Sequence, residues 1–249
     1  MLIVERQQRL LDMLREQKTA TLEQLSESLS VSASTVRRDL DMLEKQGLVE
    51  RTHGGAVFRG RRTHPIAFDE RMGVQVEAKT AIGKYAASLA EPGMTLLLDG
   101  GSTVYLAAQQ ITARPLQIVT NSLTVANLFA NDEQVEVMVI GGTLYPRTAV
   151  TVGPLATGCL ADLHADLLLF SVAGVYDDEC FNLNLDQAEV EKVMLRQVAR
   201  SVLLMDSSKF GRKSLARVCS LEQIDVIVTD AGISERWSTK LGDRLVVAT

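Results

Sequence analysis

Hydrophobic residues recur at helical spacing in three segments before residue 48. They lie three or four positions apart at Leu10, Leu11 and Leu14, at Leu22, Leu25 and Leu29, and at Val36, Leu40 and Leu43. The second segment opens on a Thr-x-x-Gln capping box at Thr21 to Gln24. Ser32 or Ser34 can cap the third segment, and Gly47 is a typical residue to end it. The pattern predicts three short helices.

Two short segments after the third helix predict a β-hairpin. The sequences "LVERT" and "GAVFR" flank His53-Gly54, which is typical of a tight turn. Two helices joined by a short turn and followed by a hairpin are the arrangement of a winged helix-turn-helix. We therefore predict this fold for residues 1–57, with the hairpin as its wing.

The third helix has a polar face opposite its apolar one. Successive residues turn by about 100°, so Ser34 and Arg38 point away from the Val36-Leu40-Leu43 stripe while Thr35 and Arg37 flank it. Arginine has the forked donors that read guanine or hold phosphate, and short hydroxyls allow close phosphate contact. An ordinary solvated helix is the alternative, but the capping box, the turn and the hairpin together favour DNA binding. We predict DNA contacts by Thr21, Ser32, Ser34, Thr35, Arg37, Arg38, Arg51 and His53.

The second part of the chain alternates aliphatic runs with helical patterns. The runs predict strands at residues 96–98, 118–119, 135–140, 167–172, 202–205, 226–228 and 245–247. Helical patterns fall near residues 79–89, 104–110, 122–130, 187–199 and 236–241. Alternation of this kind predicts a layered α/β domain with a largely parallel sheet over residues 79–249. Residues 58–78 have no clear period and are expected to form a linker.

Polar residues and glycines gather at the ends of four predicted strands. Ligands of open α/β sheets bind at this edge, where glycines permit close approach and helix N-termini attract anions. Helix caps and ordinary turns are the alternative for each cluster alone, whereas four clusters favour a site for a phosphate with a hydroxylated tail. The candidate residues are Asp99, Gly101, Ser102, Thr103, Thr120, Asn121, Ser122, Gly141, Gly142, Lys209 and, less centrally, Lys79.

Charge is divided unevenly between the two parts. The chain of 249 residues has a net charge of −5, yet residues 1–62 contain 11 Lys and Arg against 9 Asp and Glu. The remainder contains 15 against 22. A basic module joined to an acidic body is consistent with a polyanionic partner for the first part.

Several classes of protein and site are disfavoured. No apolar run is long enough to span a bilayer, and the N-terminus lacks the apolar segment of a secretory signal, so we expect a cytoplasmic protein. Three widely spaced cysteines argue against a disulfide framework and a thiolate zinc site. We expect Asp177-Asp178-Glu179 to be a solvated loop rather than a metal site, and Glu189 and Lys192 to be a helix-surface pair. No cofactor and no metal are expected.

The sequence resembles the DeoR family of bacterial regulators of sugar metabolism. The resemblance runs through "STVRRDLDMLEKQG" and "RTHGGA", and then through "DGGSTVYLA", "VTNSLTVANLF", "IGGTL" and "LLMDSSKFG". It implies a recognition helix in the major groove and an effector domain similar to ribose-5-phosphate isomerase. By the same resemblance Gly101, Ser102 and Thr103 hold phosphate, Asp99 and Asn121 meet sugar hydroxyls, and Lys209 adds charge, with Lys79 a weaker candidate.

The resemblance implies a transcriptional regulator, most simply a repressor of a sugar-uptake or sugar-catabolism operon. A phosphorylated sugar is the expected effector, operator DNA the partner, and a homo-oligomer, dimer or tetramer, the expected state. The segment at residues 176–188 departs from the family pattern beside the expected site, which leaves the effector's identity open. A sugar-phosphate isomerase or deaminase with an accessory N-terminal module is the alternative, as is, more remotely, a protein-binding adaptor, but we expect no enzyme.

Overall fold

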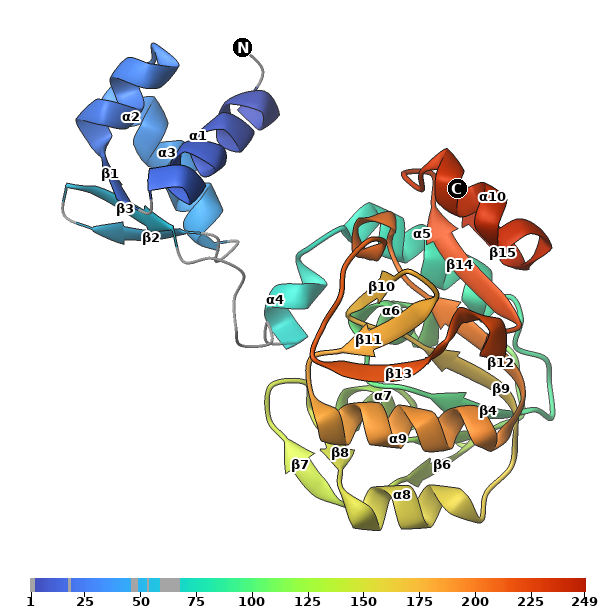
Figure 1. Ribbon diagram of the computed structural model, residues 1–249. Coiled ribbons are helices and arrows are strands. Elements are labelled where there is room, and N and C mark those ends of the chain that lie inside the picture. The colour runs from blue at the N-terminus through green and yellow to red at the C-terminus, as the bar shows by residue number, and fades with distance from the viewer. Residues whose placement is uncertain (1–2, 18, 46–48, 53, 59–67) are drawn as a thin grey trace. The chain divides into compact units, whose positions relative to one another are not determined.

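The chain forms two compact units, Met1–Pro65 and Ile66–Thr249 (Figure 1). The structure is a computed structural model that describes residues 3–17, 19–45, 49–52, 54–58 and 68–249. None of the helices in these ranges has the length and apolar character needed to cross a membrane. Each unit has its own hydrophobic core and is described by itself.

The first unit contains the three predicted helices and the predicted hairpin. Its helices are α1 (Ile3–Gln17), α2 (Leu22–Leu29) and α3 (Ala33–Lys45). Strands β2 (Val49–Thr52) and β3 (Gly55–Phe58) pair antiparallel, which confirms the hairpin. Strand β1 (Thr19–Thr21) pairs with the other edge of β3 and was not predicted, because three residues are too few to show alternation.

The apolar stripes of the three helices meet in one core. Val36 and Leu40 of α3 are fully buried together with Leu10, Leu14 and Leu25 of the other two helices. Helix α2 begins as predicted, because the Thr21 hydroxyl accepts from the Gln24 N–H at 3.2 Å and the Gln24 Oε1 accepts from the Thr21 N–H at 2.9 Å. The two bonds satisfy backbone donors that a helix start would otherwise leave unpaired.

The second unit is built on a seven-stranded parallel sheet in the order β15-β14-β12-β9-β4-β5-β6. All of its pairings are parallel, and its strands are the seven predicted aliphatic runs, which confirms the predicted class. The strands are β4 (Thr95–Leu98), β5 (Leu116–Thr120), β6 (Val135–Val139), β9 (Ala165–Phe170), β12 (Val198–Leu204), β14 (Val226–Asp230) and β15 (Leu245–Ala248).

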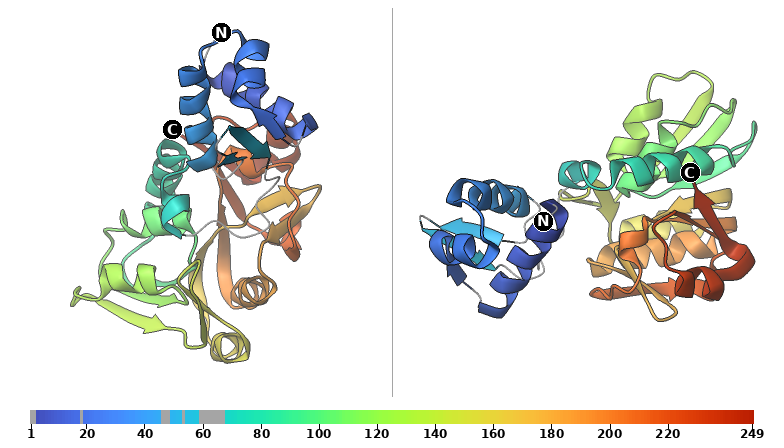
Figure 2. Two further views of the ribbon diagram at one scale, coloured as in Figure 1. Left: turned by 90° about the vertical axis from the view of Figure 1, so that its left-hand side faces the viewer. Right: turned by 90° about the horizontal axis from the view of Figure 1, so that it is seen from above.

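Helices cover both faces of this sheet (Figure 2). Alternate residues point to opposite faces, so Leu96 and Leu98 join one core cluster while Leu97 joins the other. The first cluster is covered by α5 (Val76–Ala87), α6 (Ser102–Ala108) and α7 (Leu123–Phe129). The second is covered by α8 (Pro154–Ala161), α9 (Leu185–Arg196) and α10 (Glu235–Leu241).

Two small antiparallel sheets and three 3₁₀ turns complete the unit. Strands β7 (Thr143–Tyr145) and β8 (Val150–Val152) form a hairpin after β6. Strands β10 (Gly174–Tyr176), β11 (Glu179–Asn182) and β13 (Ala216–Ser220) form the other sheet. The turns are η1 (Ser207–Lys209), η2 (Leu221–Gln223) and η3 (Gly242–Arg244). Residues 176–188, which depart from the family pattern, thus include β11 and the first turn of α9.

The range predicted as a linker, residues 58–78, contains helical residues. The five-residue helix α4 (Phe68–Met72) and the start of α5 lie in that range and belong to the second unit. Helix α4 is too short for a helical period to show in the sequence. The Phe68 ring packs edge-on against the Tyr105 ring of α6 at 5.4 Å between centroids, and this long-range contact holds it in place.

Candidate functional site

Helix α3 presents both arginines of its central pair to solvent. Arg37 and Arg38 are exposed, whereas Val36 and Leu40 on the other side are fully buried. The exposed side of a helix-turn-helix recognition helix is the side that can enter a groove. The geometry meets the condition on which the predicted DNA contact depends.

Three hydroxyls gather where α3 begins. Ser32 precedes the helix, and its Oγ accepts from the Thr35 N–H at 3.3 Å, so Ser32 is the cap and Ser34 lies within the helix. The same Oγ lies 2.8 Å from the Ser34 Oγ and 2.9 Å from the Thr35 Oγ1. Short donors at a helix start are suited to a phosphate oxygen.

The remaining predicted DNA contacts stand in different settings. The exposed Arg51 of β2 pairs with Asp41 of α3, and its backbone N–H donates to the Glu44 Oε1 at 2.9 Å. These bonds fasten the wing to the recognition helix. Thr21 caps α2, with an exposed side chain. His53 and Gly47 lie outside the described residues.

The charged sequence "RRD" at residues 37–39 contains one buried residue, Asp39, whose burial was not predicted. The carboxylate of Asp39 is only 2 % exposed and accepts from the Arg6 Nε at 2.5 Å and from the Gln7 Nε2 at 3.2 Å. This hydrogen bond with Asp39 raises the pKa of Arg6. Asp39 turns toward α1, and its pairing with α1 keeps the neighbouring arginines on the outer side of α3.

The polar cluster of the second unit lies where the strand order of the large sheet reverses. The chain runs outward from β4 to β5 and β6 and then returns to β9 on the other side of β4. The loops after β4 and β9 therefore diverge, which opens the crevice where doubly wound sheets bind ligands. Asp99 follows β4, and its Oδ2 accepts from the N–H of Ser171, which follows β9, at 3.3 Å.

Several buried polar atoms around this point have no hydrogen-bond partner among the described residues. They include three predicted site atoms, the Asp99 Oδ1, the Thr103 Oγ1 and the Asn121 Oδ1. Four more come from three residues that were not predicted, namely the Arg71 Nε and Nη2, the Thr148 Oγ1 and the Glu191 Oε2. Buried polar groups are nearly always paired, so a group of unpaired ones at a sheet's switch point indicates a ligand site.

Opposite charges crowd this site. Burial lowers the pKa of Lys79 to about 8, with the Lys209 ammonium lowering it further and the Asp206 carboxylate opposing the shift. Burial also lowers the pKa of Lys209, again opposed by Asp206. Burial raises the pKa of Asp99, against the backbone N–H groups of Gly100 and Ser171, which donate to it. The charge of Lys209 thus acts on Lys79, and the charge of Asp99 acts on Lys209.

Arg71 and Glu191 belong to the same cluster. Burial lowers the pKa of Arg71, and the charges of Asp99 and Glu191 oppose that shift. Burial, reinforced by Asp99, raises the pKa of Glu191 well above its usual range, although the Asn182 amide donates to its Oε1 at 2.5 Å. Asn182 lies in the segment at residues 176–188, which was expected to border the site. Arg71 and Glu191 do not follow a strand. A position directly after a strand was the signal by which site residues were predicted.

Two predicted site residues, Thr120 and Ser122, form hydrogen bonds with the backbone of the fold. The Thr120 Oγ1 donates to the Leu98 carbonyl at 2.6 Å and accepts from the Ser122 N–H at 3.0 Å. The Ser122 Oγ caps α7 by accepting from the Val125 N–H at 3.3 Å. Thr120 thus stabilises a turn and Ser122 caps a helix, which was the alternative to ligand binding for both hydroxyls.

The predicted glycines have distinct surroundings. Gly101 precedes α6, and a Cβ on it would stand 1.8 Å from the Ser171 Oγ, so the close approach is to protein rather than to a ligand. Ser102 and Thr103 open α6 and are buried. Gly141 and Gly142 are exposed and lead into β7, where Gly142 has a φ of +144°. They set the path of the hairpin whose turn contains Thr148.

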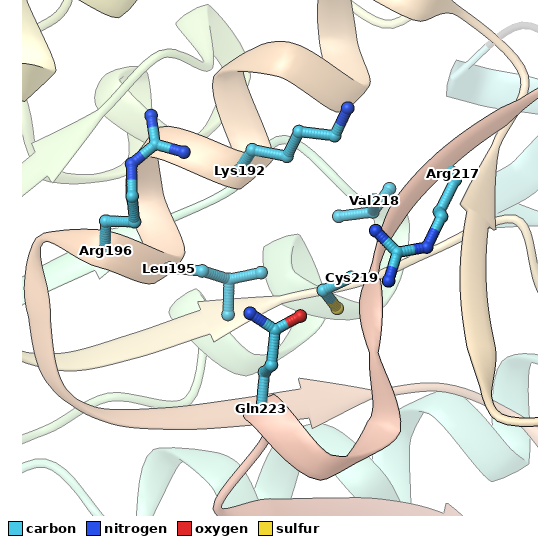
Figure 3. Close-up of a pocket in the computed structure, with 7 residues that line it drawn as sticks. All are labelled: Lys192, Leu195, Arg196, Arg217, Val218, Cys219 and Gln223. Carbon is cyan, nitrogen blue, oxygen red and sulfur yellow. The ribbon is translucent and has the colours of Figure 1, made fainter.

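A cleft lies between α9 and β13 (Figure 3). This cleft has a volume of about 440 Å³ and is lined by Lys192, Leu195, Arg196, Arg217, Val218, Cys219 and Gln223. The Lys192 ammonium pairs with Glu189 at 2.7 Å, and the Arg217 guanidinium pairs with Glu179. The first pair is the predicted helix-surface pair. None of the predicted site residues lines this cleft.

The acidic loop at residues 177–179 is held by ion pairs. Besides the Arg217–Glu179 pair, the Lys240 ammonium lies 2.7 Å from the Asp178 carboxylate. Asp177 has a φ of +52° at the turn between β10 and β11. The three acids are therefore spread around a hairpin turn rather than converging on one point.

Comparison with known proteins assigns both units. Residues 6–62 match the DeoR-like helix-turn-helix domain, and residues 74–231 match the DeoR C-terminal sensor domain. The L-fucose operon activator of Escherichia coli is 33 % identical over 90 % of this chain and 94 % of its own length. The transcriptional repressor GlcR of Bacillus subtilis is 31 % identical over 91 % of this chain and 88 % of its own.

Solved structures similar to the chain include ribose 5-phosphate isomerase of Methanocaldococcus jannaschii. The TM-score is 0.39 and the identity 17 %, over 54 % of each chain. The named relatives that match nearly the whole chain are regulators, which decides against the isomerase alternative. The chain belongs to the DeoR family and is a DNA-binding transcriptional regulator with a C-terminal sensor domain rather than an enzyme.

Proposed function

We propose that this regulator represses a sugar-uptake or sugar-catabolism operon and that a phosphorylated sugar in the second unit controls its binding to the operator. The observation that carries the proposal is the group of buried, unpaired polar atoms at the β4–β9 switch point. Lys79 and Lys209 supply cationic groups for a phosphate. The unpaired Oδ1 atoms of Asp99 and Asn121 supply acceptors for sugar hydroxyls.

On the DNA side, we propose that Ser34, Thr35, Arg37 and Arg38 of α3 contact the operator. Arg51 and His53 of the wing, and Thr21 and Ser32 at helix starts, complete the set of proposed contacts. The exposure of Arg37 and Arg38 supports this assignment. Phosphate contacts release counterions, so operator affinity should fall steeply as salt is raised.

We further propose that the protein acts as a homo-oligomer. Strand β6 is an edge of the large sheet, and its Met138 and Val139 are 48 % and 45 % exposed, with Leu144 of β7 similarly exposed at 46 %. A strand edge with unpaired backbone groups and apolar side chains on both faces is a surface with which a second chain can pair. An oligomer also presents two recognition helices at a fixed spacing, which a palindromic operator requires.

A thermal-shift screen against a panel of sugar phosphates tests the effector assignment, because a ligand that binds only the folded state raises the melting temperature. Ser102→Ala and Lys209→Ala should keep operator binding and lose the response to the compound that binds. Wild-type protein that responds to no sugar phosphate, or variants that respond fully, would contradict the assignment.

A further inference from the structure

Arg71 is a cation of the second unit whose Nε and Nη2 are buried and have no hydrogen-bond partner among the residues that the structure describes. A buried donor without a partner destabilises a fold, and a charged donor does so more strongly. The forked donors of arginine match the oxygens of a phosphate or carboxylate, which lysine cannot do in the same way.

The nearest carboxyl groups do not satisfy these donors. The charges of Asp99 and Glu191 act on Arg71, yet the Asp99 Oδ1 and the Glu191 Oε2 are themselves buried and unpaired. An arginine with a purely structural role would form bidentate bonds with one of them, as Arg6 does with Asp39. Unpaired donors and unpaired acceptors thus lie in one buried region. A polar ligand that has both kinds of group would pair with both.

Helix α4, which carries Arg71, is attached to the sensor domain by hydrogen bonds and an aromatic contact. The Lys79 ammonium donates to the Arg71 carbonyl at 2.5 Å, and the Phe68 N–H donates to the Arg147 carbonyl at 2.9 Å. The Phe68 ring packs against Tyr105 on one side, and the Arg71 guanidinium carbon lies 5.9 Å from its centroid. Residues 59–67 connect α4 to β3 of the DNA-binding unit.

We propose that Arg71 holds the anionic group of the effector and that α4 carries the occupancy of the site to the DNA-binding unit. This inference rests on the proposed function and adds to it the residue that anchors the ligand and the element that responds. An anion bound to the guanidinium also bridges α4 to the residues after β4, since Asp99, Ser102 and Thr103 belong to the same site. The bound ligand thereby fixes the first element of the sensor domain, to which the DNA-binding unit is covalently joined.

The binding half of the inference is tested with full-length protein and two variants, Arg71→Met and Arg71→Lys. Arg196→Met is the matched control, because Arg196 is an exposed arginine that lines the separate cleft of Figure 3. Thermal shifts are measured with inorganic phosphate and with the sugar-phosphate panel. Arg71→Met should weaken binding by about tenfold or more, Arg71→Lys should restore part of it, and Arg196→Met should bind as wild type does.

The outcomes separate the two proposals. If no sugar phosphate binds the wild-type protein, the proposed function fails and this inference falls with it. If wild-type protein binds one and Arg71→Met binds it equally well, only the inference is overturned. Loss of binding in Arg196→Met with normal binding in Arg71→Met also overturns it and moves the anion to the cleft.

The coupling half is tested with Phe68→Ala, which removes a ring that packs α4 in place but has no polar group to offer a ligand. The DNA is a duplex that wild-type protein selects from a randomised pool. Phe68→Ala should bind the sugar phosphate and the duplex, while the change in duplex affinity caused by the ligand is lost. A full ligand-dependent change in this variant shows that α4 does not carry the signal and overturns this half.

Discussion

Replacing Lys79 by methionine should stabilise the sensor domain in the absence of ligand. Lys79 is 3 % exposed, and its burial lowers its pKa from 10.5 to about 8. The folded state therefore binds its proton less tightly than the unfolded state does. The free energy of unfolding should rise as the pH increases from 8 to 10.5, because the unfolded state still holds a proton that the folded state has released. At neutral pH the charge of Lys79 opposes folding.

The size of the effect follows from the pKa difference. One pKa unit corresponds to 1.36 kcal/mol, so the charge of Lys79 destabilises the fold by about 3 kcal/mol at pH 7 and about 2 kcal/mol at pH 9. Methionine is unbranched and apolar, and it removes this term. It also removes the bond from the Lys79 Nζ to the Arg71 carbonyl, at a loss of about 1 kcal/mol. The variant should be more stable than wild type by about 2 kcal/mol at pH 7 and about 1 kcal/mol at pH 9.

Urea unfolding followed by tryptophan fluorescence measures this difference. Trp237 is the only tryptophan, is 8 % exposed and packs on Phe210, so its emission reports unfolding of the second unit. Lys84→Met, at an exposed position of the same helix, is the control and should match wild type. A Lys79→Met advantage that is absent at pH 7, or that grows with pH, would refute the reasoning.

Three further predictions concern other parts of the molecule. Arg38→Ala should weaken duplex binding by about 1–3 kcal/mol and reduce the salt slope by about one while the melting temperature stays unchanged, with the exposed Arg200→Ala as control in fluorescence anisotropy. Leu40→Ala, at a fully buried position, should lower the stability of the DNA-binding unit by about 2–5 kcal/mol in circular dichroism melts, and unchanged stability would contradict the assigned core. Gly101→Ala should destabilise the second unit by about 1–3 kcal/mol, because its Cβ meets the Ser171 Oγ at 1.8 Å; adding Ser171→Gly should restore most of that stability.

The elements predicted from the sequence are those whose burial gives a regular pattern of hydrophobic residues along the chain. The inner strands β14, β12, β9, β4 and β5 bury apolar residues on both faces, so each appears in the sequence as an aliphatic run, and the partly exposed edge strands β6 and β15 are aliphatic as well. The first three helices each bury one face, and α2 also has a capping box that depends only on neighbouring residues. Local physical rules suffice for such elements.

The missing elements are short or depend on distant contacts. Helix α4 exists through the packing of Phe68 on Tyr105, and β1 through its pairing with β3. Helix α8 has the apolar and small residues "PLATGCLA" with almost no polar face, so its sequence gives no amphipathic period. Each needed a partner that the local sequence does not identify.

The site shows the same division. Asp99, Thr103 and Asn121 follow strands of a parallel sheet, and this rule alone located them. Arg71 and Glu191 reach the cluster from helices far apart in sequence, and an exposed charge at those positions would look the same in the sequence. Thr120 and Ser122 show the limit of the rule, since a strand-end hydroxyl can equally serve the fold's own backbone.

The free energy available at α4 is of the size that regulation needs. Two hydrogen bonds of α4, from the Lys79 ammonium and to the Arg147 carbonyl, are worth about 0.5–1.5 kcal/mol each, and the Phe68–Tyr105 aromatic pair is worth about the same. Allosteric coupling of about 1–3 kcal/mol changes an affinity by about 5–150-fold. A ligand that strengthens or replaces only these contacts can therefore shift operator affinity over that range. A helix with a large apolar contact would be too firmly held to respond, and one with no contact could not report whether the site is filled.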